Sequence, residues 1–312
     1  MNGSEIPVLS VIVVIASDTT TPRAEVSLLA RCLEALSKQT NAPPTEIIVP
    51  YHQRVDGIDC LQKEFPDVAF VPVADLKSWS ATGGSREHHD ELKTRALEVA
   101  RGAIIEFLED NEVSDENWCA HTVKAHRENY AGIGGAIENS IDRTLNWAVY
   151  YCDFGRYQNP IPSGDSTFAS DANVSYKRAA LEQVRSAWEQ GFNEVTINAA
   201  LMARGEKLAL RPDIIAYQQR SSLRLGPALR ERYVWGRSFG PVRCKVMSPA
   251  QRIVNAVLSP LLPGIVALKM SSAAWKRRRN FGKFLKALPF IVLLLASWSF
   301  GELLGYLTGR PA

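Results

Sequence analysis

Segments with the composition of strands and of helices alternate through about the first 130 residues, and this alternation restricts the fold more than any other sequence feature. Short apolar runs rich in β-branched residues are typical of strands that are buried on both faces. Such runs occur at 8–16, 45–50, 68–73 and 102–108. Helices are expected after them, at 23–40, 57–65, 90–100 and 114–129. Repeated strand–helix units of this kind predict an α/β domain with a parallel sheet.

The ends of these strands indicate where a ligand would bind. In parallel sheets of this class, ligands bind beyond the carboxyl ends of the strands. Polar residues stand at three of these ends, as Ser17-Asp18, Tyr51-His52 and Glu109-Asp110-Asn111. We therefore expect these three segments to form the site.

The pattern is less regular after residue 131. Strands are expected at 132–137, 171–176, 208–210 and 214–217. Helices are expected at 177–189 and 194–204, and a loop is expected at 160–170.

The charge of the chain is distributed unevenly. Residues 1–203 contain 17 basic and 29 acidic side chains, a net charge of −12, whereas residues 204–268 carry +8 and residues 269–312 carry +7. A nucleic-acid-binding protein would place basic residues around a recognition module, so we expect no nucleic-acid partner. An acidic domain followed by a basic end is typical of a chain that lies against membrane lipids.

The last long apolar run, Ala287–Thr308, predicts a transmembrane helix. Its 22 residues contain one charge, Glu302. A helix of this length extends about 33 Å, enough to cross a hydrocarbon core of about 30 Å. Seven basic residues and no acidic residue lie between Lys269 and Lys286, which places this flank on the cytoplasmic side and Arg310 on the far side.

A second apolar stretch, Ile253–Leu268, is interrupted by Pro260, Pro263 and Gly264. Its 16 residues are short for a span, and a crossing would place the basic flank outside, against the positive-inside rule. We therefore expect a re-entrant or interfacial segment, with a two-helix hairpin as the alternative.

The N-terminus and the cysteines indicate the cellular compartment of the first domain. Met1–Pro7 contains no basic n-region, so we expect the first domain to remain in the cytosol. The five cysteines are widely spaced without a C-x-x-C pair, which favours reduced thiols. The expected divisions are a domain at 1–225, a basic interfacial or re-entrant helical region at 226–286, and a transmembrane helix and tail at 287–312.

These segments, in their order along the chain, resemble the family 2 glycosyltransferases. The matching pieces are VLSVIVVIAS, TEIIVPYHQ, LKTRALEVARGAIIEFLEDNEVSDENW, GGAIEN, FASDANVSYKRAAL, QGFNEVTINAALMARGEKLALRPD and the apolar tail. The resemblance implies the GT-A fold, a Rossmann-like, mixed and mostly parallel sheet flanked by helices, with C-terminal membrane-associated helices. It also implies a membrane-attached, hexosyltransferase-type enzyme that transfers a sugar with inversion. The donor would be a nucleotide-diphospho-sugar, and the acceptor a lipid-linked molecule or a glycan.

The resemblance assigns roles at the strand ends. Glu109, Asp110 and Asn111 occupy the family's metal-binding position, where Mg²⁺ or Mn²⁺ would bridge the two phosphates of the donor. Asn111 stands where the family's metal-binding motif usually ends in an aspartate. Tyr217-Gln218-Gln219 stands where the family has a later histidine that also binds the metal. These departures indicate weaker metal dependence or lost activity. The acidic residue with which the family holds the base of the nucleotide is also missing after the second strand. Tyr51 could stack on the nucleotide base instead, and His52 could hydrogen-bond to it.

The catalytic base is expected at Glu194. The family places a carboxylate at a helix N-terminus after a G-F/W-x-E/D pattern, which Gly191-Phe192-Asn193-Glu194 matches. An inverting transfer needs such a carboxylate to remove the proton from the acceptor hydroxyl. A glutamate that only stabilises the helix dipole would look the same in sequence.

Other basic and polar residues have implied contacts. Arg95 would lie near the nucleotide, or on a solvated helix face. The segment with Asn173, Tyr176 and Arg178 matches the one that lines the acceptor side. Arg232 and Arg237 would pair with the diphosphate, or with anionic lipid headgroups.

Two function hypotheses remain. The first is the membrane-attached glycosyltransferase, and the second is a catalytically silent GT-A domain that binds a nucleotide sugar or scaffolds a glycan-assembly complex. A nucleotidyltransferase is disfavoured, because Ser17-Asp18-Thr19-Thr20 is not a glycine-rich basic signature.

Overall fold

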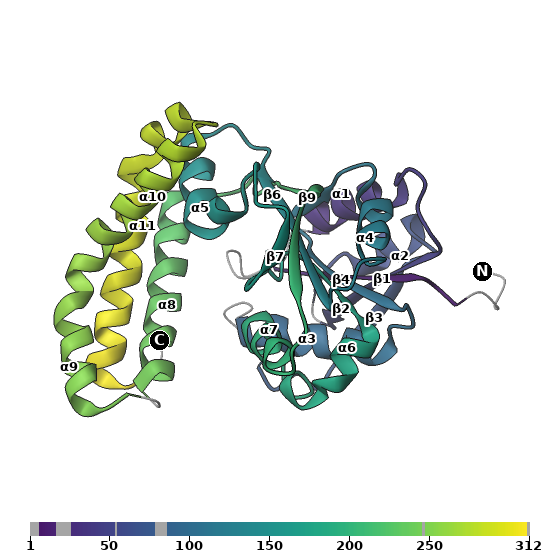
Figure 1. Ribbon diagram of the computed structural model, residues 1–312, viewed down its shortest axis with the longest axis horizontal. Coiled ribbons are helices and arrows are strands. Elements are labelled where there is room, and N and C mark those ends of the chain that lie inside the picture. The colour runs from purple at the N-terminus through teal and green to yellow at the C-terminus, as the bar shows by residue number, and fades with distance from the viewer. Residues whose placement is uncertain (1–5, 17–25, 54, 79–85, 245–246, 311–312) are drawn as a thin grey trace. The chain divides into compact units, whose positions relative to one another are not determined.

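A computed structural model describes residues 6–16, 26–53, 55–78, 86–244 and 247–310 (Figure 1). The chain forms two compact units. The first contains the chain up to Glu138 together with Tyr157–Gln219, and the second contains Asn139–Arg156 together with the chain from Arg220 onward. The second unit therefore includes residues 139–156, which the sequence analysis placed within the first domain.

The first unit is built around one mixed sheet. Its described strands are β1 (Leu9–Val14), β2 (Thr45–His52), β3 (Ala69–Val73), β4 (Ile104–Glu109), β5 (Glu112–Ser114), β6 (Gly132–Asn139), β7 (Gly164–Ser166), β8 (Asn173–Lys177) and β9 (Leu208–Gln218). The order is β3-β2-β1-β4-β8-β6-β9-β5, and β7 pairs with β9. The strands are parallel from β3 to β4, and β8 pairs with β4 in the antiparallel direction. The predicted α/β class is confirmed.

Helices cover both faces of this sheet (Figure 1). They are α1 (Val26–Ser37), α2 (Ile58–Glu64), α3 (Arg86–Val99), α4 (Trp118–Ala125), α6 (Arg178–Gln183) and α7 (Glu194–Ala203). Val11 and Val13 of β1 pack into the core that contains α1, α2 and α4, whereas Ile12 and Val14 pack into the core that contains α3, α6 and α7. This alternation explains why β1 is apolar at every position except Ser10.

Three short elements differ from the expectations. Residues 112–114 form β5 instead of entering a helix, and β7 lies within the expected loop 160–170. β9 continues through Pro212, where two separate strands were expected. The register explains this continuity, because β7 pairs with Leu208–Leu210 and β5 pairs with Ala216–Gln218. Pro212 lies between these two partners, where its missing N–H group removes no bond to either strand.

The second unit is helical. Its elements are α5 (Thr144–Phe154), α8 (Leu225–Cys244), α9 (Pro249–Leu258), α10 (Leu262–Arg277) and α11 (Phe281–Thr308). A 3₁₀ turn, Ser259–Leu261, joins α9 to α10, so the prolines there do not interrupt the helical path. By length and composition, the segments Pro249–Arg277 and Phe281–Thr308 could each cross a membrane. Within this unit, α11 lies between α8 and the α9–α10 segment (Figure 1).

Candidate active site

The turn after β4 is anchored at the carboxyl end of the parallel strands. Val14, the last residue of β1, is in register with Glu109, the last residue of β4. Oδ1 of Asp110 accepts a hydrogen bond from the amide of Ala16 at 2.8 Å, which ties this turn to the end of β1. The predicted convergence of strand ends is therefore present for β1 and β4, while Ser17 and Asp18 lie outside the described residues.

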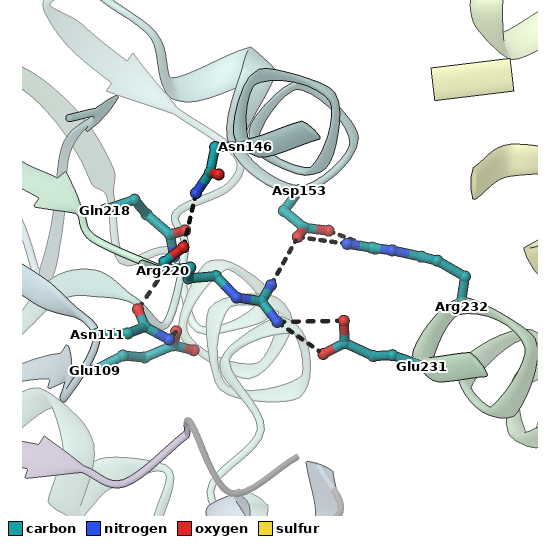
Figure 2. A network of polar contacts seen from close by, with 8 residues as sticks. All are labelled: Glu109, Asn111, Asn146, Asp153, Gln218, Arg220, Glu231 and Arg232. Atoms are coloured by element: carbon teal, nitrogen blue, oxygen red, sulfur yellow. Dashed lines mark hydrogen bonds and ion pairs between the residues drawn. The ribbon is translucent and has the colours of Figure 1, made fainter. Parts of the chain in front are cut away.

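The side chains of this turn are largely buried. Asp110, Asn111 and Glu112 are buried, and Glu109 is half-buried. Nδ2 of Asn111 donates to Glu109 at 3.4 Å, and Oδ1 of Asn111 accepts from Nε2 of Gln218 at 3.2 Å (Figure 2). The backbone amide of Gln219 also donates to the Asn111 carbonyl. The asparagine is thus held by the end of β9.

A buried lysine lies beside this turn. Lys93, on α3, is 2% exposed. Its ammonium group donates to Asp171 at 2.6 Å and lies 4.0 Å from Asp90. Burial lowers the pKa of Lys93, but the charges of Asp171, Asp90 and Glu194 raise it above its usual value. Lys93 therefore supplies a permanent positive charge among these carboxylates.

The electrostatics also affect Glu109. Burial and, next, the charge of Asp171 raise the pKa of Glu109 to about 7, against the opposing effects of Lys93 and His89. Burial likewise raises the pKa of Glu112 well above its usual value. Near neutral pH, Glu109 consequently gains or loses a proton in response to small changes in charge nearby.

Glu194 begins α7 on the same side of the sheet. Asn193 caps this helix, because its Oδ1 accepts from the amide of Thr196 at 3.2 Å. Glu194 is 7% exposed, and its charge contributes to the raised pKa of Lys93. Segments from β4, α3, the start of β8 and α7 therefore bring carboxylates around one lysine.

The three residues expected to hold a metal ion do not by themselves form a complete cation site. Among the residues that the structure describes, no three His, Cys, Asp or Glu side chains are arranged to hold a cation. The Asn111 oxygen already accepts from Gln218, and one Asp110 oxygen accepts from the Ala16 amide. Divalent Mg²⁺ and Mn²⁺ favour carboxylate and carbonyl oxygens that are free to coordinate. An ion that is bound together with a nucleotide needs only one or two carboxylates besides the phosphates, so metal binding by Glu109, Asp110 and Asn111 stays a prediction.

The expected base-binding residues separate into two environments. His52 is buried at the end of β2, and its ring centroid lies 6.5 Å from that of His88, which lies 5.9 Å from that of His89. Tyr51 instead packs against the core on the α1 and α2 side of the sheet. The structure therefore groups His52 with two histidines of α3, which the sequence analysis did not select.

Arg95 lies on a different face of α3 from Lys93. It forms ion pairs with Asp75 at 3.0 Å and with Glu98 at 3.8 Å, and its side chain is 35% exposed. The basic residue that α3 directs toward the carboxylates is Lys93, two positions earlier.

Two of the three expected acceptor-side residues have structural contacts. Asn173 is fully buried, where Nδ2 donates to the carbonyls of Ala136 and Ile214 and Oδ1 accepts from Trp118. Tyr176 is also fully buried, and its hydroxyl donates to Asn198. These buried contacts give both side chains a structural role, and their assignment to the acceptor side stays a prediction.

Arg178 lies beside the start of β4, at the opposite end of the parallel strands from the turn after β4. Lys177 is in register with Ile104, at the start of β4, whereas Asn173 is in register with Leu108, near its end. Nε of Arg178 donates to the Gly102 carbonyl at 2.7 Å, before β4 begins. Arg178 thus lies apart from the carboxyl ends of β1 and β4, and its acceptor-side role stays a prediction.

The two expected diphosphate ligands, Arg232 and Arg237, both belong to α8 of the second unit. Both terminal nitrogens of Arg232 donate to Asp153, at 2.5 and 2.6 Å (Figure 2). Arg220 joins Asp153 to Glu231 in the same cluster. The guanidinium of Arg232 is thus committed within its own unit, whereas Arg237 is half-buried.

Comparison with known proteins supports the fold. No protein-family model matches the chain, and no curated protein matches it. One similar solved structure is the mannosyltransferase PcManGT from Pyrobaculum calidifontis in complex with GDP-Man and Mn²⁺. It is 14% identical with a TM-score of 0.52, and the match covers 93% of this chain and 86% of that chain. The chain therefore has the fold of a glycosyltransferase.

Proposed function

We propose that this protein is a membrane-attached, inverting glycosyltransferase of the family 2 type. It transfers a sugar from a nucleotide-diphospho-sugar to a lipid-linked or glycan acceptor on the cytoplasmic side of the membrane. The observation that carries the proposal is the group of carboxylates around Lys93 at the carboxyl end of a parallel sheet. Ligands of such sheets bind at this edge. The similarity to a structure determined with GDP-Man and Mn²⁺ supports the same class of donor.

Glu194 is the general base in this proposal. Its carboxylate takes the proton from the acceptor hydroxyl while the hydroxyl oxygen bonds to the anomeric carbon of the donor. The bond between that carbon and the phosphate oxygen breaks, and the nucleoside diphosphate leaves. Its place at the start of α7 also favours negative charge on the carboxylate through the helix dipole.

Lys93 compensates the charge of the leaving group. Its buried ammonium lies among groups that would otherwise repel a diphosphate. A fixed cation in a poorly solvated site stabilises negative charge that develops in the transition state. A divalent ion held by Glu109 and Asp110 would add positive charge beside the same phosphates.

The test is a transfer assay with a panel of nucleotide sugars, with membrane lipid extract and oligosaccharides as acceptors. Glu194→Gln should remove transfer and retain donor binding, because an amide cannot accept the proton. Glu189→Gln, an exposed change near the same helix, is the matched control. Transfer by the Glu194→Gln variant at more than about half the control rate would move the base elsewhere.

The silent GT-A domain is the second candidate. The neutral pair Asn111 and Gln218, at the expected metal position, favours it. Calorimetry combined with the transfer assay distinguishes the two, because a silent domain would bind a nucleotide sugar and never turn it over.

A further inference from the structure

The α9–α10 segment buries small side chains and exposes large apolar ones, the opposite of a helix in a water-soluble protein. Its buried side chains are small: Ala256, Ser259, Ala267 and Ala274. Its large apolar side chains are exposed, with Val257 at 69% and Leu268 at 73%. A helix in a water-soluble protein buries its large apolar residues, whereas helices in lipid pack through small ones.

The outer side of α11, which packs against α9 and α10, carries the same kind of residue. Exposed apolar residues recur along one side of the helix, at Leu285, Val292, Leu293, Phe300 and Leu307. We call the exposed apolar side chains of α9–α10 and α11 together the apolar face. Contiguous exposed apolar surface on this scale marks an interaction site.

Basic residues border the apolar face at both ends. Arg252 precedes it and Lys269 follows it on α9–α10, and Lys283 and Arg310 do so on α11. Trp275 is exposed beside the turn between α10 and α11, where an aromatic ring suits the boundary between lipid and water. Positive charge around an apolar surface complements anionic lipid headgroups.

On the side of the second unit away from the apolar face, α8 carries charged residues beside the middle of α11. Oγ of Ser297, in the middle of Ala287–Thr308, donates to the carbonyl of Leu229 on α8 at 2.7 Å. The next residues of α8 are exposed Arg230 and the buried pair Glu231 and Arg232, which belong to the cluster with Asp153 and Arg220. If α11 crossed the bilayer, these charges would lie near its centre, where ionised groups are costly.

We propose that the second unit enters one leaflet only, through the apolar face, and that α9–α10 and α11 do not cross the bilayer. The helices lie along the membrane, with α8 toward the headgroups and water. Between Arg252 and Lys269 the apolar stretch has 16 residues, or about 24 Å, which suits a surface lying in a leaflet better than a span of about 30 Å. This inference rests on the membrane attachment in the proposed function, and it replaces the single crossing expected for Ala287–Thr308.

Cysteine labelling in cells that express the full chain tests this arrangement. Single cysteines are introduced at Ala250, Ala273 and Arg310, after the accessible Cys60, Cys152 and Cys244 are replaced by serine. A membrane-impermeant maleimide should label none of the three positions in intact cells and all of them in inverted membrane vesicles. Labelling of any position from outside intact cells, or labelling only after detergent is added, would overturn the proposal. No step of the assay depends on sugar transfer.

A second measurement tests the apolar face itself. Leu261→Glu, at the exposed centre of the face, should lower partitioning of the purified protein onto phosphatidylglycerol-containing vesicles by roughly tenfold or more, given the ordinary value of burying one leucine. Val99→Glu, a similarly exposed apolar position on α3, should leave partitioning unchanged. Equal binding by both variants, or a wild-type protein that forms a dimer and ignores vesicles, would refute lipid as the occupant.

Discussion

The close contact between α8 and α11 gives a sharp prediction for the second unit. Gly236 and Gly240 on α8 face Gly301 and Gly305 on α11. A Cβ atom at Gly301 would lie 2.1 Å from the carbonyl oxygen of Tyr233 and 2.8 Å from the amide nitrogen of Arg237. Both atoms belong to the backbone, so no side-chain rotation relieves the overlap. Gly301→Ala must therefore push the two helices apart.

The magnitude follows from two opposing effects. Overpacking in a well-packed interface costs about 1–3 kcal/mol, and the separation also loosens the neighbouring glycine contacts. Alanine in place of glycine within a helix returns up to about 1 kcal/mol. We expect a net loss of about 1–2 kcal/mol for Gly301→Ala. Gly282→Ala on the same helix has no atom within 4 Å of its added Cβ, so it should be neutral or stabilising.

The assay is denaturant unfolding of both variants in one detergent, followed by circular dichroism of the helical signal. The difference between the two alanine variants isolates the packing effect, because both gain the same helix propensity. Equal midpoints for Gly301→Ala and Gly282→Ala would show that α8 and α11 are not in contact at this position.

Three further predictions concern the first unit. Glu194→Gln should lower the transfer rate by about 10²–10⁴ and leave donor affinity close to wild type, as measured by steady-state kinetics and calorimetry. Chelation by EDTA should lower donor affinity, and an unchanged affinity would exclude the metal site expected at Glu109, Asp110 and Asn111. Burial lowers the pKa of His126 to about 3. The unfolded chain therefore takes up the proton first, and stability present above about pH 6.5 is lost as the pH falls, by up to about 1.4 kcal/mol per unit. Urea unfolding between pH 7 and 5 checks this, and His126→Asn should flatten that dependence.

The parallel half of the sheet could be predicted because its signal is local. Strands buried on both faces are apolar at most positions. β1 shows this with Ser10 as its one exception, and β4 shows it apart from Glu106 and its last residue, Glu109. β5 and β7 have three residues each, and they exist only because β9 offers them an edge. No pattern within three residues encodes a partner about 50 or 100 positions away.

The sequence indicated which segments contribute to the candidate site better than it indicated which side chains do. Helical spacing on α3 places His89, Leu92, Lys93 and Ala96 on one buried side, and this periodicity could have selected Lys93 instead of Arg95. Asn173 and Tyr176 could not be judged in the same way. Their roles depend on carbonyls and side chains from other strands and helices, such as Ile214 and Asn198.

The C-terminal helices show why hydropathy alone leaves the membrane arrangement open. A run of 22 apolar residues with basic flanks is compatible with a single crossing and with insertion into one leaflet, so the composition of Ala287–Thr308 does not distinguish them. The two differ in what lies beside the helix at half its length. Here Ser297 lies against Leu229, and three charged residues follow Leu229 directly on α8. A bilayer that surrounded α11 at that level would also have to surround those charges, whereas a leaflet that meets only the apolar face leaves them in water.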